Sequence, residues 1–244
     1  MNAKRDAMQF PFSPRFERLL DLAIEEDLPH GDITSESIFG PSDAATARFL
    51  AKSRLVICGL PVIMPVFRRF PHAATFTPFV EEGEECEPGT VLGEAGGSVL
   101  TLLGAERTCL NFLQHLSAIA TVSRRLYKLA GGRIEVVDTR KTLPGWRDLQ
   151  KYAVSVGGCR NHRACLSSGV LIKDNHIDAC GSVAEAVARV RRRVAHGMKI
   201  EVEVRSEAEV QEAIQAGAEI LLLDNMGVEE IRRICSIYRG RARF

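Results

Sequence analysis

The stretch KIEVEVRSEAEVQEAIQAGAEILLLDN, Lys199 to Asn225, contains two apolar strand-like runs with a helix-like segment between them. The runs are dense in Val, Ile and Leu, which is typical of parallel strands covered on both faces. The middle segment begins with Ser206 and Glu209 at capping-box spacing, and Gly217 stands where a helix would end. This stretch therefore predicts a strand–helix–strand unit of a parallel sheet with a right-handed crossover.

The same alternation extends over the whole second half of the chain, from about Arg133 onward. Each strand-like run precedes a segment with helical periodicity: IEVVD and WRDLQKYAVSV, GVLIK and SVAEAVARVRRRVAHG, KIEVEV and SEAEVQEAIQAGA, EILLLDN and GVEEIRRICSIYRG. Four such units in succession predict one parallel sheet with its helices packed outside.

The first half of the chain has a different pattern. An amphipathic segment, RFERLLDLAIEEDL, precedes short strand-like pieces with turn signals such as EEGEECEPGTVLGEAGG, which favours an antiparallel sheet. The segment LTLLGAERTCLNFLQHLSAIATVSRRLYKLA predicts one long helix or two abutting helices, with a domain boundary near Ser117. We predict an α/β protein whose N-terminal domain, residues 1–117, is α+β and whose C-terminal domain, residues 118–244, is built from parallel strand–helix units.

Composition excludes several classes of partner. The chain of 244 residues has 32 Lys and Arg against 31 Asp and Glu, so we expect no general attraction to nucleic acid or acidic membranes. The run Leu55 to Phe67 is uncharged but holds two prolines and is shorter than the roughly 20 residues of a membrane span. The start, MNAKRDAMQFPF, lacks the apolar core of a secretory signal, and the seven cysteines form no CxxC pair. These features predict a soluble cytoplasmic protein with reduced thiols.

Charged residues follow the predicted strands. Ligands of parallel α/β folds gather beyond the carboxyl ends of the strands, so these residues are candidates for a site. The strand ends carry Asp138, Arg140 and Lys141, then Lys173, then Glu203, then Asp224, and the loop GGCRNHRACLSSG adds Arg160, His162 and Arg163. Residues 138–176 hold seven Lys or Arg against three Asp. This local excess predicts a pocket for a ligand with several carboxylate or phosphate groups.

The two carboxylates have alternative interpretations. A strand-end residue such as Asp224 often only caps a loop. Glu203 alternates with Val202 and Val204, and an unpaired carboxylate inside a barrel would be costly. We therefore predict that Glu203 and Asp224 share a magnesium ion with a substrate phosphate.

The histidine and cysteine of the glycine-rich loop also allow alternatives. His162 could be a structural histidine, but its place beside Arg163 favours a ligand contact. Cys159, His162 and Cys165 have C-x2-H-x2-C spacing, which could hold zinc; two interleaved arginines and the lack of a second ligand pair argue against it. The run RVRRR, residues 189–193, lies late in a predicted helix and is interpreted as a solvated face.

Several motifs together resemble one family over roughly residues 15–239. They are EEDLPHGDIT, GAERTCLNFLQHLSAIAT, DTRKTLPGWRDLQKYAV, GGCRNHR, VLIKDNHI, EVEVRS and ILLLDNM, and their order and spacing are similar to those of quinolinate phosphoribosyltransferase. The resemblance implies transfer of phosphoribosyl from phosphoribosyl pyrophosphate to quinolinate with decarboxylation, in de novo NAD biosynthesis. It also implies an N-terminal α+β sandwich domain followed by an open, incomplete parallel α/β barrel, with magnesium as cofactor.

The resemblance further implies roles for particular residues. Quinolinate carboxylates would be bound by Arg140, His162, Arg163 and Lys173, with Thr139 among the substrate-binding residues. Lys141 would contact the anionic substrates as a catalytic residue, with Glu203 and Asp224 on the ribose and metal side. Arg107 would reach the site of a neighbouring subunit in a homodimer or a dimer-based hexamer.

The sequence departs from the family pattern in two places. Cys159 replaces the third glycine of the loop before NHR, where a close approach or positive φ could be required. After YRGRARF the family continues with a loop that holds the phosphoribosyl phosphate, so we expect an exposed sheet edge after Asp224. Two alternatives are a catalytically dead or truncated quinolinate-binding subunit and the molybdenum-associated paralogue, although LIKDNH argues against the paralogue.

Overall fold

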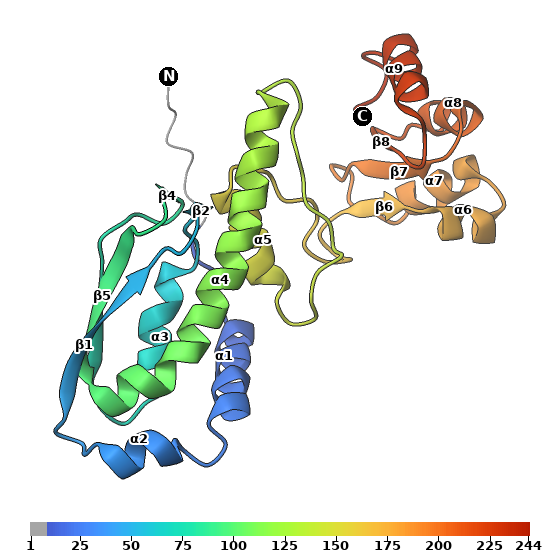
Figure 1. Ribbon diagram of the computed structural model, residues 1–244. Helices are drawn as coiled ribbons and strands as arrows, with labels where there is room; N and C mark the ends of the chain where they lie inside the picture. Colours follow the sequence, from blue (N-terminus) through green and yellow to red (C-terminus); the bar gives the residue numbers. More distant parts are fainter. Residues whose placement is uncertain (1–8) are drawn as a thin grey trace. The chain divides into compact units, whose positions relative to one another are not determined.

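The computed structural model describes residues 9–244, which form two compact units that divide between Ala164 and Cys165 (Figure 1). The expectation about a secretory signal rests partly on residues 1–8, which lie outside the described residues. Among the described helices, none is long and apolar enough to cross a membrane.

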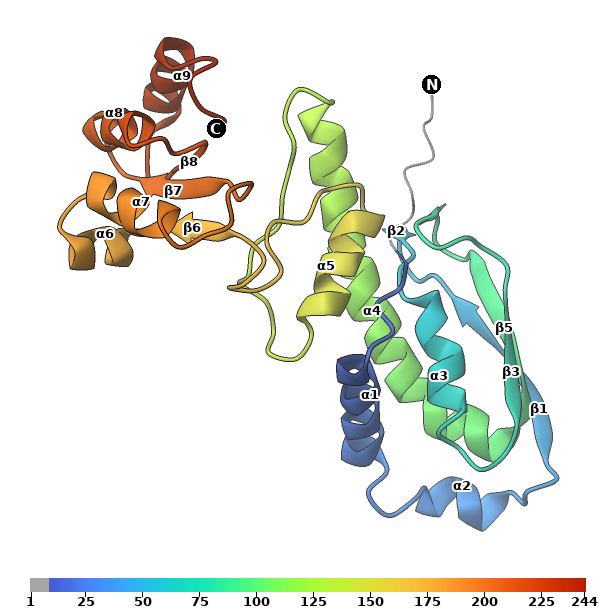
Figure 2. The ribbon, with the colours of Figure 1, turned by 180° about the vertical axis from the view of Figure 1, so that it is seen from behind.

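The first unit contains an antiparallel sheet of three strands in the order β1-β5-β3. Its strands are β1 (Ala44–Leu50), β3 (Ala74–Pro78) and β5 (Val91–Ser98), and a small separate sheet pairs β2 (Leu55–Val56) with β4 (Glu85–Cys86). Helix α3 (Ile63–Phe67) and the long helix α4 (Val99–Ala130) cover one side of the sheet in both views (Figures 1 and 2). This arrangement confirms the predicted N-terminal α+β sandwich.

Helix α4 is one continuous helix of 32 residues and ends at Gly131, whose φ of 57° closes it in the left-handed region. Its buried face contributes Ala105, Phe112 and Leu116 to a hydrophobic core shared with helix α1 (Pro14–Asp27). The same core includes Leu149, Tyr152 and Ala153 of helix α5 (Arg147–Val156). The short helix α2 (Ile33–Ile38) is capped at its N-terminus by Asp32. Because α5 packs into this core, the first compact unit extends well beyond Ser117, and the predicted boundary there stays a prediction.

The second unit contains a parallel sheet in the order β6-β7-β8. Its elements are β6 (Val170–Ile172), α6 (Asp174–Cys180), α7 (Val183–Arg191), β7 (Ile200–Val204), α8 (Glu207–Gln215), β8 (Ile220–Leu223) and α9 (Val228–Ile237). Both predicted caps are present, since the Ser182 and Ser206 hydroxyls accept hydrogen bonds from the N–H groups of Glu185 (3.1 Å) and Glu209 (3.3 Å). The parallel strand–helix alternation is confirmed for the last three of the four predicted strands.

The structure differs from the sequence-based expectation in three local details. The first expected strand, IEVVD, is reduced to an isolated parallel bridge between Val137 and Arg160, because only this short stretch meets a partner. Helix α6 follows β6 directly and was missed, because DNHIDAC is too short for helical periodicity to be read. The edge of β8 is paired at its beginning, since Leu221 N donates to Arg243 O at 2.8 Å.

Candidate active site

The motif DTRKT forms a loop, residues 138–142, that lies against the chain segment carrying NHR. Asp138 N donates to Arg160 O at 3.1 Å and Arg160 N donates to Val136 O at 2.9 Å, so the two segments run parallel for a short distance. The Asp138 carboxylate then accepts a hydrogen bond from His162 N at 2.8 Å. The structure therefore brings together the DTRKT loop and the NHR loop, residues 160–163.

The DTRKT loop presents two cations whose side chains have no partner in the described part of the chain. Arg140 is half-buried, and its Nε atom is buried without a hydrogen-bond partner among the described residues. The Lys141 side chain is exposed and makes no hydrogen bond or ion pair with another described residue. The loop itself is ordered locally, because the Thr139 hydroxyl accepts a hydrogen bond from Lys141 N at 3.0 Å. Two positive charges that find no partner within residues 9–244 are available to an anionic ligand.

Helix α5 contacts both loops through residues that share one face. Arg147 Nε donates to the Thr142 hydroxyl at 3.1 Å, and Gln150 Oε1 accepts from Leu143 N at 3.1 Å. Lys151 Nζ lies 2.5 Å from Asp138 Oδ1 and donates to His162 O at 3.0 Å. The spacing of i, i+3 and i+4 places these three residues side by side on the helix.

A small cavity of about 270 Å³ lies between α4, α5 and the DTRKT loop. It is lined by Ile119, Asp138, Thr139, Lys141, Thr142, Gln150, Lys151 and Val154. The lining therefore combines apolar contacts with two lysines, one of which is already paired. Of the substrate-binding residues predicted for the first unit, Thr139 and Lys141 line this cavity.

The second unit brings Lys173, Glu203 and Asp224 to the carboxyl ends of its three strands. Glu203 is only 9 % exposed, and its Oε2 lies 3.2 Å from Lys173 Nζ. Asp224 follows β8, where its N–H donates to Val204 O at 2.9 Å and its carboxylate accepts from Asn225 Nδ2 at 2.7 Å. The buried carboxylate predicted from the sequence is therefore paired with a cation, which removes the cost of leaving it alone.

Metal binding was predicted for Glu203 and Asp224. No group of three or more His, Cys, Asp or Glu side chains within residues 9–244 is arranged to hold a metal ion. Two carboxylates on neighbouring strands nevertheless suit magnesium, which keeps several waters and takes further oxygens from substrate phosphates. The predicted zinc alternative gains no support, since the Cys159 thiol instead donates to Ser123 O at 3.2 Å.

Sequence reasoning passed over Lys151, although it lies inside the motif DTRKTLPGWRDLQKYAV. A lysine in an amphipathic helix is usually solvated, whereas this one is 4 % exposed. Helical periodicity gave no signal for it, because position 151 lies about 160° around the helix from Leu149 and about 100° from Tyr152. Arg107, by contrast, is exposed on α4 and makes no hydrogen bond or ion pair with another described residue.

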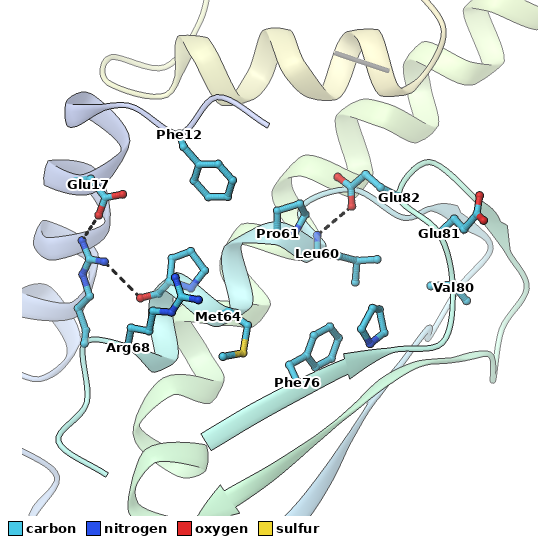
Figure 3. A pocket seen from close by; sticks show the side chains of 13 residues that line it. Phe12, Glu17, Leu60, Pro61, Met64, Arg68, Phe76, Val80, Glu81 and Glu82 are labelled. Atoms are coloured by element: carbon cyan, nitrogen blue, oxygen red, sulfur yellow. Dashed lines mark hydrogen bonds and ion pairs between the residues drawn. The ribbon is translucent and has the colours of Figure 1, made fainter. Parts of the chain in front are cut away.

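A larger cavity, about 890 Å³, lies in the N-terminal sandwich between α1, α3 and β3 (Figure 3). Phe12, Met64 and Phe76 contribute apolar walls, and Glu82 lies at one end beside Leu60 (Figure 3). None of the motif residues predicted to bind substrate lines this cavity. The smaller cavity beside the DTRKT loop is therefore the better candidate for an anion site, despite its size.

Glu82 belongs to a buried polar cluster that joins the sandwich to α5. Its carboxylate accepts hydrogen bonds from Gly59 N at 2.6 Å, Leu60 N at 3.0 Å and the Tyr152 hydroxyl at 3.0 Å. Burial raises the pKa of the Glu82 carboxyl, although these hydrogen bonds lower it. Tyr152 is the neighbour of Lys151, so this cluster helps to fix the helix that holds the two loops.

Comparison with known families gives matches along most of the chain. A family model described as "Quinolinate phosphoribosyl transferase, N-terminal domain" matches residues 32–117, and the corresponding C-terminal domain model matches residues 119–244. A probable nicotinate-nucleotide pyrophosphorylase (carboxylating) of Bacillus subtilis is 39% identical over 224 residues, covering 91% of this chain and 77% of the relative. One from Methanocaldococcus jannaschii is 40% identical, covering 90% of this chain and 77% of the relative.

Solved structures agree with these sequence matches. The crystal structure of NadC from Streptococcus pyogenes has a TM-score of 0.89 and 40% sequence identity, covering 95% of this chain and 83% of that one. The nicotinate-nucleotide pyrophosphorylase from Francisella tularensis has a TM-score of 0.89 and 35% identity, covering 96% and 84%. Neither the inactive-subunit alternative nor the molybdenum-associated alternative receives support from these comparisons.

Proposed function

This chain belongs to the quinolinate phosphoribosyltransferase family, and we propose on that premise that it transfers phosphoribosyl from phosphoribosyl pyrophosphate to quinolinate. The products are nicotinate mononucleotide, carbon dioxide and pyrophosphate. The observation that carries the proposal is a pair of cations, Arg140 and Lys141, whose side chains are unpaired among the described residues and whose loop is hydrogen-bonded to the NHR loop.

Quinolinate has two adjacent carboxylates on a pyridine ring, so it needs several cationic groups converging on one side. Arg140, His162 and Arg163 of the first unit are proposed to bind these carboxylates together with Lys173, and Lys141 contacts the anionic substrates. The fork of an arginine can bind a carboxylate through two parallel hydrogen bonds, which fixes the plane of the ring as well as its charge. Thr139 orders the loop and adds a hydroxyl at its edge.

The reaction replaces the ribose bond to pyrophosphate with a bond to nitrogen, and it replaces one carbon–carboxylate bond with a carbon–hydrogen bond. The ring nitrogen of quinolinate attacks the anomeric carbon of the ribose while the bond from that carbon to pyrophosphate breaks. Positive charge develops on the ribose in this step, and a carboxylate such as Glu203 or Asp224 would stabilise it. The carboxylate next to the ring nitrogen then leaves as carbon dioxide. Its bonding electrons stay on the ring carbon beside the cationic nitrogen, and that carbon takes a proton from water.

Magnesium is the proposed cofactor. Glu203 and Asp224 would hold the ion, which would neutralise the negative charge of the departing pyrophosphate. Support comes from the donor set, since both side chains offer carboxylate oxygens at the ends of neighbouring parallel strands.

We also propose a cytoplasmic homodimer or dimer-based hexamer. The location is supported by the seven cysteines, which are all free thiols. The assembly is supported by Arg107, an exposed cation without an intramolecular partner among the described residues. If Arg107 completes a neighbouring site, mixing R107A with R140A should restore part of the activity that each variant lacks. No restoration in mixed oligomers of normal size would contradict this role.

Turnover of the purified chain tests the proposed reaction. Pyrophosphate and carbon dioxide should appear in equal amounts only when quinolinate, phosphoribosyl pyrophosphate and magnesium are all present. R140A should weaken quinolinate binding by about 10- to 100-fold, the effect of losing a hydrogen bond between charged groups. R125A is a matched control, because Arg125 is an exposed arginine of α4 outside the proposed site. A folded chain that releases neither product would overturn the proposed activity.

A further inference from the structure

We propose that Lys151 is a positioning residue for the quinolinate site, holding the DTRKT and NHR loops in the relative arrangement that a dicarboxylate requires. This inference rests on the proposed function. Lys151 is almost completely buried on the face of α5 that contacts the two loops, where an ammonium group is costly unless it is paired. Its ammonium group bonds to one atom of each loop, Asp138 Oδ1 and His162 O, and so connects the two loops.

Asp138 is the centre of this connection. Its carboxylate accepts from Lys151 Nζ at 2.5 Å, from Asn161 Nδ2 at 2.7 Å and from His162 N at 2.8 Å. The ion pair is dry, with side chains of Lys151 and Asp138 exposed by only 5% and 9%. Asp138 lies two residues before Arg140, and Asn161 and His162 lie immediately before Arg163. A shift of the carboxylate would therefore move the proposed quinolinate-binding cations of both loops.

Lys151 also contacts the NHR loop without Asp138 as an intermediary. Its Nζ donates to His162 O at 3.0 Å, and its own carbonyl accepts from Asn161 Nδ2 at 2.8 Å. One lysine thus binds a side chain of the first loop and the main chain of the second. A hydrophobic residue of similar length could fill the space but would leave the Asp138 carboxylate without its cation.

The helix that carries Lys151 is itself held in place. The Tyr152 hydroxyl donates to Glu82, which Figure 3 shows beside Leu60 at the end of the larger cavity. Arg124 of α4 donates to Val156 O at 3.1 Å and to Gly157 O at 2.9 Å, which fixes the last turn of α5. Figures 1 and 2 show α5 alongside α4 in both views. Because α5 is fixed against the sandwich, Lys151 holds the two loops at a fixed position relative to the sandwich.

A purely structural role for the ion pair makes a different prediction. Loss of stability alone reduces the amount of active enzyme, and it leaves the KM of each substrate unchanged. Misplacement of the two loops should instead weaken quinolinate much more than phosphoribosyl pyrophosphate. The loops carry three proposed quinolinate ligands, whereas Glu203 and Asp224, on the proposed ribose and metal side, belong to the other compact unit. The ratio between the two KM changes separates the roles.

The decisive experiment compares K151M and N161A with K128M, using the full chain. Lys128 is a matched lysine, since it forms an ion pair with Glu85 at 2.6 Å but is more than half exposed and contacts neither loop. K151M should raise the quinolinate KM by about tenfold or more, the effect of one lost charged hydrogen bond. N161A, which removes no charge, should raise it about three- to fivefold with little change in Tm. Both variants should leave the KM for phosphoribosyl pyrophosphate within about twofold, and K128M should change neither constant.

Hydrogen exchange gives a readout independent of turnover. Amides of residues 138–142 and 160–163 should exchange faster in N161A and K151M than in the wild type, and in K128M they should not. Equal quinolinate KM in all variants, or equal changes in both KM values, would overturn the positioning role. Should K151M fail to fold, N161A decides alone. A wild-type chain that does not bind quinolinate would refute the proposed function, while faster exchange confined to the two loops would still identify Lys151 as their connection.

Discussion

Removal of the Tyr152 hydroxyl tests the connection between the sandwich and α5. Tyr152 is 3% exposed, and its hydroxyl donates to Glu82 at 3.0 Å. Y152F deletes this donor, and the carboxylate keeps its main-chain donors, Gly59 N and Leu60 N, and its hydrogen bond with the Cys58 thiol. A hydrogen bond to a charged group contributes about 1.5–3 kcal/mol, so the free energy of unfolding near neutral pH should fall by about 2 kcal/mol. For a unit of this size the Tm should fall by about 4–8 °C.

The loss should depend on pH with a definite sign. Burial already raises the pKa of Glu82 above its ordinary value of 4.5, and the bond from Tyr152 opposes that rise. Y152F therefore raises the folded-state pKa further. Between the folded-state pKa of the wild type and that of Y152F, Glu82 is ionised in the wild type and still protonated in the variant. The difference in free energy of unfolding between the two proteins therefore grows as the pH rises through this interval. Below both values Glu82 is neutral, and the loss should shrink to about 1 kcal/mol, that of an uncharged hydrogen bond.

Urea unfolding at about pH 4 and about pH 7.5 measures both losses, with the slope m monitored for changes in the denatured state. E82Q provides the control, because glutamine keeps the shape and cannot ionise. In the E82Q background, Y152F should cost about 1 kcal/mol at both pH values. An equal loss at both pH values in the wild-type background would refute the assignment of a raised pKa to a Tyr152-bonded Glu82.

Two further predictions follow from the described contacts. G157A should lower the free energy of unfolding by about 1–3 kcal/mol, measured in urea. A Cβ at position 157 would lie 2.4 Å from Ser123 Cβ and 2.6 Å from Ala120 O, which is too close for either atom. An unchanged urea midpoint would contradict this close packing. The exposed Cys165 thiol has a pKa lowered to about 7, chiefly by its hydrogen bond with Ser167. The rate of its alkylation by iodoacetamide should therefore reach half its maximum near pH 7. S167A should move this midpoint to higher pH. If S167A leaves the midpoint unchanged, the hydrogen bond with Ser167 is not what lowers the pKa of Cys165.

Sequence patterns were sufficient for the elements whose stability is local. Helices α7 and α8 begin at Ser182 and Ser206 because a serine hydroxyl satisfies an N–H of the first turn within the same segment. The apolar runs of β7 and β8 could be placed because buried parallel strands need no polar face. The candidate residues at strand ends followed from the general position of sites in parallel sheets, and the family followed from the combination of motifs.

The remaining features depended on contacts between distant segments. The run IEVVD has strand composition, but a strand needs a partner over several residues, and only Val137 finds one in Arg160. Periodicity assigned no role to Lys151, because the helical pattern records only that position 151 is polar, whereas its partners Asp138 and His162 lie on other segments.

The sequence by itself determined the family, the strand–helix order and the cationic motifs, because these depend on residue type and spacing along the chain. Only the tertiary structure decided which cations are occupied and which are available. Lys151 and Arg140 are both basic residues of one motif, yet Lys151 is paired with Asp138 while Arg140 has an unsatisfied Nε. That difference arises from burial and from the meeting of the two loops on α5, because an ion pair requires its partners to be close in space and not merely in sequence.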